Sequence, residues 1–304
     1  MKVLLSIFYL SVTLIAAPLM LGVINRTKAL FAGRTGQPLL QLYYDLWKLL
    51  HKGAVYSRST TWVFRAGPIV GLASILVVAM LTPFGGAPAL IGFSGDLILF
   101  AYFLGLIRFF TVLAALDTGS AFEGMGASRE VTFSALAEPA LLLGLAVVAR
   151  KTGSLSLSGM FSGDAVTAWA HAGPAVLLVA GSLLIILLAE SARIPVDDPN
   201  THLELTMIHE VMVLDHGGPD FAFILYTSAL KLWVLGTLLI NVLIPARTGF
   251  FLFDGVIALV GMLGLAIGIG VIESIMARLR LLRVPQLLVA AGALAGLAMF
   301  LVLR

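Results

Sequence analysis

One short segment holds many of the residues in this chain that could carry chemistry. It runs from Ala189 to Ala222 and reads AESARIPVDDPNTHLELTMIHEVMVLDHGGPDFA. Its ionisable residues are Glu190, Arg193, Asp197, Asp198, His202, Glu204, His209, Glu210, Asp215, His216 and Asp220. Carboxylates, arginine and histidines this close together can form ion pairs, pass protons or, with suitable geometry, hold a metal ion. The rest of the chain must therefore show which of these uses is available.

The spacing of the three histidines in this segment indicates whether they could form a metal site. His202, His209 and His216 are seven residues apart, which would bring them to one face of a helix. However, Gly217 and Gly218 end any helix at the third histidine, and no acid lies one turn from all three. We therefore predict no metal site in this chain and expect these histidines to form hydrogen bonds or to relay protons.

The composition shows which solvent surrounds most of the chain. Of its 304 residues, 60% are hydrophobic and 12% are charged, and the mean hydropathy is +1.05. A soluble globular protein is about half apolar and a quarter charged, so most of this surface must face lipid. The chain has no cysteine, which excludes disulfides, thiolate zinc sites and cysteine-ligated iron–sulfur clusters within it. The sequence also shows no nucleic-acid-binding patch.

Apolar runs of about 20 residues are long enough to cross the hydrocarbon core as helices. Eight such runs predict an all-α integral membrane protein, with residues 1–304 forming a single polytopic domain. The first run is longer than the core of a signal peptide, so we expect it to remain as a span. The eight runs are Val3–Val23, Ala66–Leu81, Leu97–Leu116, Phe133–Ala149, Pro174–Ala189, Phe221–Ile244, Val256–Ile272 and Val284–Leu303.

The distribution of lysine and arginine predicts the orientation of these spans. Twelve of the nineteen basic residues lie in the loops on the side of the 190–220 segment, and five lie on the opposite side. Because cytoplasmic loops are enriched in Lys and Arg, we expect both termini to be external. The cytoplasmic loops are then 25–65, 117–132, 190–220 and 273–283.

The first of these loops contains a second, shorter helix signal. Apolar side chains recur at helical spacing after Pro38, while Tyr44 and Trp47 suit the headgroup zone. This pattern predicts an amphipathic helix lying in the cytoplasmic membrane interface; the alternative is a surface helix packed on a partner subunit. The apolar positions are Leu39, Leu42, Tyr43, Leu46, Leu49 and Leu50.

A few charged residues fall inside or beside the predicted spans. Each costs at least about 2.5–3.5 kcal/mol to insert, so such residues are either functional or paired. Arg193 follows Glu190 by one helical turn, which predicts an ion pair if the helix continues. The intramembrane set is Arg108, Glu138, Glu190 and Lys231, with Asp45 and Glu273 near the boundary. One interpretation is that they only fix helix register; the other is a proton route formed with the neighbouring loop acids.

The same loop residues resemble a known family. The pattern in the 190–220 segment resembles the loop beside the quinone site in the NADH–quinone oxidoreductase subunit 1 family, the complex I membrane subunit. Gly33–Gly36 and Tyr44–Lys48 resemble the segment that follows the first helix of that family. The resemblance covers nearly the whole chain and implies eight spanning helices with external termini. Its residues in the loop are Glu190, Arg193, Pro195, Asp197, Pro199, Glu204 and Leu205.

Two positions depart from the quinone-reducing pattern. Asn200 and His202 stand where those members tend to carry glutamates, and here the loop resembles the homologous subunit of group 4 membrane-bound [NiFe] hydrogenases of the formate hydrogenlyase type. That resemblance implies a prokaryotic cytoplasmic (inner) membrane complex whose soluble arm lies on the cytoplasmic side. The implied partners are soluble [NiFe] hydrogenase large and small subunits, an iron–sulfur protein and antiporter-like membrane subunits. The NiFe centre and iron–sulfur clusters would then belong to those partners, with no cofactor and no catalytic centre in this chain.

The resemblance also implies roles for individual residues. Asp45, Glu138 and Glu190 would belong to a proton path towards the antiporter-like subunits, and Glu204 and Glu210 would connect that path to the docking surface. The alternative function is the quinone-site membrane subunit of a respiratory NADH dehydrogenase. The residues expected to form the docking loop and its charge pairs are Arg193, Asp197, Asp198, His202, His209, Glu123 and Glu130.

Overall fold

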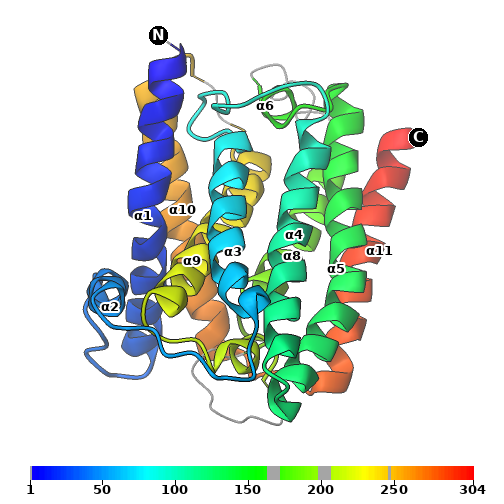
Figure 1. Ribbon diagram of the computed structural model, residues 1–304. Coiled ribbons are helices and arrows are strands. Elements are labelled where there is room, and N and C mark those ends of the chain that lie inside the picture. The colour runs from blue at the N-terminus through cyan, green and yellow to red at the C-terminus, as the bar shows by residue number, and fades with distance from the viewer. Residues whose placement is uncertain (1, 163–171, 198–206, 246–247) are drawn as a thin grey trace.

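The protein is a bundle of long helices (Figure 1). The computed structural model describes residues 2–162, 172–197, 207–245 and 248–304. In these ranges, eight helical segments are long and apolar enough to cross a membrane, which confirms the predicted fold class. The long helices are α1 (Lys2–Phe31), α3 (Trp62–Leu81), α4 (Asp96–Asp117), α5 (Ala121–Thr152), α8 (Gly173–Glu190), α9 (Gly218–Leu243), α10 (Phe251–Ile275) and α11 (Val284–Leu303). The short elements are α2 (Gln41–Leu50), α6 (Leu157–Met160), η1 (Glu210–Val213) and η2 (Leu281–Arg283).

Several helices continue beyond the apolar runs of the sequence. Helix α5 begins at Ala121, so the expected loop 117–132 is a loop only over residues 118–120. The charged side chains in the first turns of α5 do not end the helix, because glutamate and arginine are good helix formers. Groups from other elements contact two of them: Glu123 accepts a hydrogen bond from the backbone of Asp215, and Glu130 contacts Arg108. The apolar run therefore identifies the span but underestimates the length of its helix.

Helix α9 lies at the centre of the bundle. In the most apolar 18-residue stretch of α9, 67% is buried inside the protein, whereas in the corresponding stretch of the span that includes α11 only 22% is buried. Helices α1 and α10 pack together on one side, and α5 and α11 on the other (Figure 1). Glycine allows one of these close approaches, because a Cβ on Gly255 would lie 2.0 Å from the hydroxyl of Tyr9. All eight spans contribute to one large cluster of buried apolar side chains, and two smaller clusters lie apart from it.

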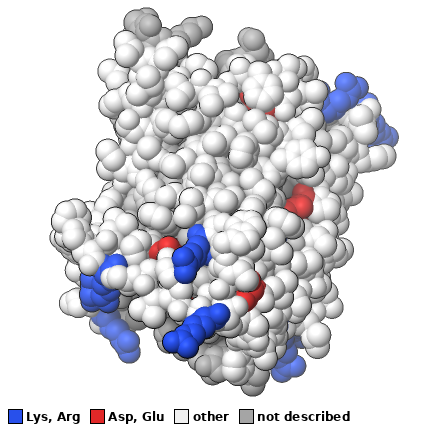
Figure 2. Space-filling model, in the orientation of Figure 1, with Lys and Arg blue, Asp and Glu red and all other residues white. Residues whose placement is uncertain are grey.

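The two ends of the bundle differ. Both termini lie at one end, and α2 and η1 lie at the other (Figure 1). Most of the face shown in Figure 2 is uncharged, and several Lys and Arg side chains gather at the end with α2. Helix α2 packs against α1 and α9, and its Tyr43 hydroxyl donates to the backbone carbonyl of Ile15. Tyr44 and Trp47 are exposed, as expected for a helix at the membrane interface.

Asp117 fixes the relation between α3 and α4. Its carboxylate accepts hydrogen bonds from the backbone N–H of Thr61 at 2.6 Å, from the Thr61 hydroxyl at 2.8 Å and from the backbone N–H of Phe64 at 3.3 Å. A carboxylate at a helix N-terminus satisfies otherwise unpaired donors. Asp117 therefore has a structural role, and it holds the start of α3 beside the end of α4.

Candidate functional site

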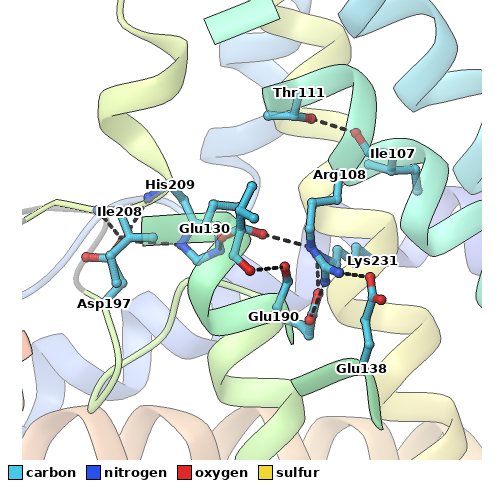
Figure 3. Close-up of polar contacts among 12 residues, drawn as sticks. Ile107, Arg108, Thr111, Glu130, Glu138, Glu190, Asp197, Ile208, His209 and Lys231 are labelled. Carbon is cyan, nitrogen blue, oxygen red and sulfur yellow. Dashed lines mark hydrogen bonds and ion pairs between the residues drawn. The ribbon is translucent and has the colours of Figure 1, made fainter. Parts of the chain in front are cut away.

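Arg108 is the centre of an ionic cluster inside the bundle (Figure 3). Its side chain projects from α4, is 9% exposed, and contacts a different carboxylate with each of its three nitrogens. Nε donates to Glu130 at 3.0 Å, while the two terminal nitrogens contact Glu138 and Glu190. The planar guanidinium suits this role because its donors point in fixed, divergent directions. One side chain thereby joins α4 to α5 and α8.

Lys231 adds a fourth helix to the cluster. Its ammonium lies 2.7 Å from the second carboxylate oxygen of Glu190, the last residue of α8. All four charged residues that the sequence places inside the spans are thus paired with one another. Because paired charges are tolerated in a membrane where isolated ones are not, this pairing explains how the chain can keep them. The intramembrane cluster, defined as Arg108, Glu130, Glu138, Glu190 and Lys231, holds three carboxylates and two fixed cations.

His209 connects this cluster to the 190–220 segment (Figure 3). Its Nε2 lies 3.1 Å from Glu130, and its Nδ1 lies 3.3 Å from Asp197. Burial of the imidazole opposes its ionisation, but the charge of Glu130 and the hydrogen bonds with both carboxylates outweigh burial and raise the pKa of His209 to about 10. His209 is therefore a cation at physiological pH.

Asp197 anchors the described part of the loop. Its Oδ2 accepts hydrogen bonds from the backbone N–H groups of Ile208 at 3.2 Å and His209 at 3.1 Å, and Arg278 contacts its Oδ1 at 2.7 Å. Burial raises the pKa of this carboxyl group, but His209 and Arg278 outweigh burial and lower the pKa overall. The Asp197 side chain is consequently held as a carboxylate inside the protein.

A glycine on α5 lets η1 approach closely enough for these contacts. A Cβ on Gly126 would lie 2.3 Å from a methyl carbon of Val211 and 3.0 Å from the backbone oxygen of Ile208. Gly126 lies one helical turn before Glu130 on α5. The close approach of η1 to α5 therefore places His209 within reach of Glu130.

The predicted pair between Glu190 and Arg193 is wrong. Helix α8 ends at Glu190, so Arg193 does not follow it on the same helical face. Arg193 instead contacts Glu273 of α10 at 3.3 Å, and Lys28 of α1 contacts the same carboxylate at 2.8 Å. Arg193 thus ties the loop to α1 and α10, in a second ionic group separate from Arg108.

A cavity of about 410 Å³ lies between the loop and the spans. Side chains from α1, α2, α3, α9 and η1 line it, together with Glu190 and Lys231 of the intramembrane cluster. Asp45 and Glu210 face this cavity, and Asp45 accepts a hydrogen bond from Gln41 at 2.9 Å. The cavity has the volume of a small-molecule site and enough polar lining to hold water. Asp45, Glu190 and Glu210 all line this one cavity.

The other residues of the predicted site have separate places. Glu123 is buried and accepts a hydrogen bond from the backbone of Asp215 at 3.3 Å, outside the intramembrane cluster. Asp198, His202 and Glu204 lie outside the described residues. Arg193, Asp197, Glu123 and Glu130 are all buried within this chain. Arg193, Asp197 and Glu130 form ion pairs there, whereas Glu123 accepts a backbone hydrogen bond.

The histidines that are described do not share one environment. His216 stacks on Phe64 with ring centroids 3.8 Å apart and planes 8° from parallel. Burial lowers the pKa of His216 to about 4, and the nearby Asp220 and Asp215 offset only part of that effect. His209 is a cation and His216 is neutral at pH 7, so the equal spacing in the sequence does not give equal roles.

The sequence identifies Arg108 and Lys231 as intramembrane charges, but the predicted site does not include them. The high insertion penalty of an unpaired cation was the signal that could have placed them there. Arg278 and Lys28 gave no comparable signal, because each is one basic residue among several in the cytoplasmic loops. Their carboxylate partners lie far away in the sequence.

Comparison with known proteins agrees with this architecture. The family described as NADH dehydrogenase matches residues 3–304. The chain is 32% identical over 306 residues to formate hydrogenlyase subunit 4 of Escherichia coli K12, covering 98% of each protein. It is 34% identical over 236 residues to hydrogenase-4 component C of the same organism, covering 77% of this chain and 73% of that protein.

A solved structure has the same fold. One chain of the membrane-bound sulfane sulfur reductase, an archaeal respiratory membrane complex, matches with a TM-score of 0.85 and 18% identity, covering 99% of both chains. The family match over nearly the full length, together with the two relatives above 30% identity, confirms the resemblance found in the sequence. This chain belongs to the NADH dehydrogenase family of complex I-like membrane subunits.

Proposed function

We propose that this chain is the membrane anchor and proton- or ion-path subunit of a complex I-like membrane-bound [NiFe] hydrogenase of the formate hydrogenlyase type. The observation that carries the proposal is the intramembrane cluster: one buried arginine holds three carboxylates from two helices, and a lysine from a third helix shares one of them. Paired acids and bases that lie this close can change protonation together when one partner moves. The identity to two E. coli hydrogenase subunits supports the class of complex.

The path has two openings in this geometry. On the loop side, the cavity reaches Glu190 and Lys231 and also meets Asp45 and Glu210. On the lateral side, the Glu138 side chain is 48% exposed although it lies within a span. A carboxylate facing lipid at this depth is costly, so an adjacent membrane subunit covers this face. The antiporter-like subunits suit that position, and protons or sodium ions would pass to them by way of Glu138.

The redox chemistry would belong to other subunits. The chain has no cysteine, so it offers no thiolate ligand for a NiFe centre or an iron–sulfur cluster. The soluble hydrogenase large and small subunits and an iron–sulfur protein would dock on the end that carries α2 and η1. In this arrangement the chain lies in the prokaryotic cytoplasmic membrane, with the soluble arm on the cytoplasmic side as the basic loops predict.

The proposal is tested in the intact complex reconstituted into liposomes. Glu138→Gln and Glu190→Gln each remove one titratable carboxylate while keeping a side chain of similar size. We expect hydrogen evolution to stay close to the parent rate, and the number of ions moved per hydrogen to fall severalfold, because the titratable carboxylate on the path is lost. The measurement is the simultaneous recording of hydrogen production and internal pH or sodium.

Asp215→Asn is the matched control, because Asp215 is an exposed acid of the same segment outside the intramembrane cluster. It should leave both readouts unchanged. Normal hydrogen evolution with an undiminished ion ratio in both glutamine variants would refute the path role and leave an anchoring role alone.

The cavity favours a second candidate function. Its volume, its largely apolar lining and its position beneath the loop suit the headgroup of a quinone. A quinone-site membrane subunit of a respiratory NADH dehydrogenase would use that cavity as its substrate chamber. A quinone-site inhibitor that blocks turnover of the purified complex would favour this function, whereas full turnover without added quinone would favour the hydrogenase.

A further inference from the structure

The surroundings of His209 define its protonation state without reference to any titration. A neutral imidazole has one N–H donor and one acceptor nitrogen. Here Nε2 lies 3.1 Å from a carboxylate oxygen of Glu130, and Nδ1 lies 3.3 Å from one of Asp197. Ionised carboxylates only accept hydrogen bonds, so an imidazolium with a proton on both ring nitrogens satisfies this geometry with both acids ionised. The ring is an imidazolium with one partner in the loop and one in a spanning helix.

Charge balance leads to the same conclusion. The intramembrane cluster contains three carboxylates, Glu130, Glu138 and Glu190, and two fixed cations, Arg108 and Lys231. The imidazolium supplies the third positive charge. Because a buried group with unequal charges is strongly disfavoured in a low-dielectric surrounding, the position of His209 affects every member of the cluster.

Among the described residues, charged groups face His209 from several elements. Asp197 of the loop and Glu130 of α5 contact its ring. Arg278, between α10 and η2, contacts Asp197 at 2.7 Å. Arg129 of α5 donates to the backbone oxygen of Met207 at 2.8 Å, and Glu210 is the next residue in the chain. Behind Glu130 lie Arg108, Glu190 and Lys231.

We propose that His209 is a charged clasp: its contacts with Asp197 and Glu130 couple the position of residues 207–213 to the charge balance of the intramembrane cluster. The inference rests on the proposed function and adds a positioning residue to it. When a docked partner moves residues 207–213, the imidazolium leaves Glu130, and the cluster is left with three carboxylates and two cations. A proton taken up from the cavity side then restores neutrality, and its release follows when the clasp closes.

The first test separates charge from shape at position 209 in the reconstituted complex. His209→Gln removes the charge, whereas His209→Arg keeps it and can reach two carboxylates. We expect the Gln variant to evolve hydrogen close to the parent rate while ions moved per hydrogen fall severalfold, because the cluster has lost one positive charge. The Arg variant should restore the ratio to within about twofold. His51→Gln, which changes an exposed histidine at the same end, is the matched control.

A second variant displaces His209 without altering it. Gly126→Ala places a methyl group against Val211 and the backbone of Ile208, which pushes η1 away from α5. Gly124→Ala is its matched control, since a Cβ there meets no atom within 4 Å. We expect the Gly126 variant to lower the ion ratio as His209→Gln does, and the Gly124 variant to keep it.

A spectroscopic readout distinguishes a charged clasp from a packing role. In complex labelled with ¹⁵N-histidine, the His209 signals, assigned by their loss in His209→Arg, should show two protonated ring nitrogens until the pH approaches about 10. A neutral ring at pH 7 would overturn the inference. So would equal impairment of the Gln and Arg variants, an unchanged ion ratio in the Gln variant, or loss of complex assembly in the Gln variant alone. If Glu138→Gln and Glu190→Gln lower the ratio but His209→Gln does not, the clasp fails while the path function stands.

Discussion

Buried carboxylates occur at both ends of the bundle, but their partners differ. At the end with the termini, Asp96 accepts hydrogen bonds from the backbone of Leu157 at 2.7 Å and the hydroxyl of Ser156 at 2.8 Å. Asp254 there accepts from the backbone and hydroxyl of Thr248 at 2.9 and 2.7 Å. On the loop side, Glu130 contacts Arg108 and His209, two side chains that carry charge.

The two kinds of partner suggest two kinds of acid: acids with a structural role, and acids whose protonation can change when a neighbouring element moves. Backbone N–H groups and hydroxyls near Asp96 are uncharged donors, so they hold its side chain in place but bring no charge that could change. The arginine, lysine and imidazolium partners of Glu130 and its neighbours come from several helices and a loop. A small movement of one of these elements therefore changes the charge balance around every carboxylate of the intramembrane cluster. Only the second arrangement can link a movement to the uptake of a proton.

The largest predicted effect comes from removing the centre of the loop-side arrangement. Arg108→Met leaves three carboxylates with Lys231 and His209 as their remaining cations. Loss of one partner from a buried ionic group typically costs about 3–5 kcal/mol, so we expect the assembled complex to melt at a much lower temperature and to accumulate poorly. Arg150→Met, at the exposed end of α5, is the control. An Arg108→Met complex as stable as the parent would show that the ion pairs do not hold these helices together.

At the end with the termini, we expect a smaller loss of stability and no change in ion movement. Asp96→Asn replaces one acceptor oxygen by an amide that meets backbone donors, which should lower stability by about 1–3 kcal/mol. The number of ions moved per hydrogen should not change, because no titratable partner contacts Asp96 among the described residues. Thermal unfolding and the liposome assay measure the two effects. A lowered ion ratio in this variant would abolish the distinction between the two ends.

The smallest effect is a pH dependence of the described loop. The pKa of His209 is raised from 6.5 to about 10, so its contacts contribute fully below pH 6.5 and are lost as the pH rises through 10. The pKa of His216 is lowered to about 4, so its stacking contributes fully above pH 6.5 and is lost as the pH falls through 4. Hydrogen exchange of residues 207–217, corrected for the intrinsic rate, should show greatest protection near pH 6.5. His209→Arg should remove the alkaline loss and leave the acidic one.

Local sequence information predicted the spans but not their ends. Eight apolar runs were sufficient because a membrane requires that length of helix. The first turns of α5 carry Glu123, Arg129 and Glu130, which local hydropathy places in a loop. They are helical because glutamate and arginine have high helix propensity, which hydropathy does not measure.

The sequence could predict which charged residues belong to the site, but it could not predict which of them contact one another. The insertion penalty identified Glu138, Glu190, Arg108 and Lys231 one by one. Their convergence depends on the packing of four helices, and the partner of Arg193 lies 80 residues away on α10. The helical spacing that predicted a pair with Glu190 did not apply, because the helix ends at that residue.

The half-exposed Glu138 has a consequence for the life of the protein in the cell. Without the neighbour proposed above, Glu138 would face acyl chains, where a carboxylate is costly and destabilises the inserted chain. The cellular amount of this subunit should therefore follow the supply of the neighbour that shields Glu138, and surplus copies should be short-lived.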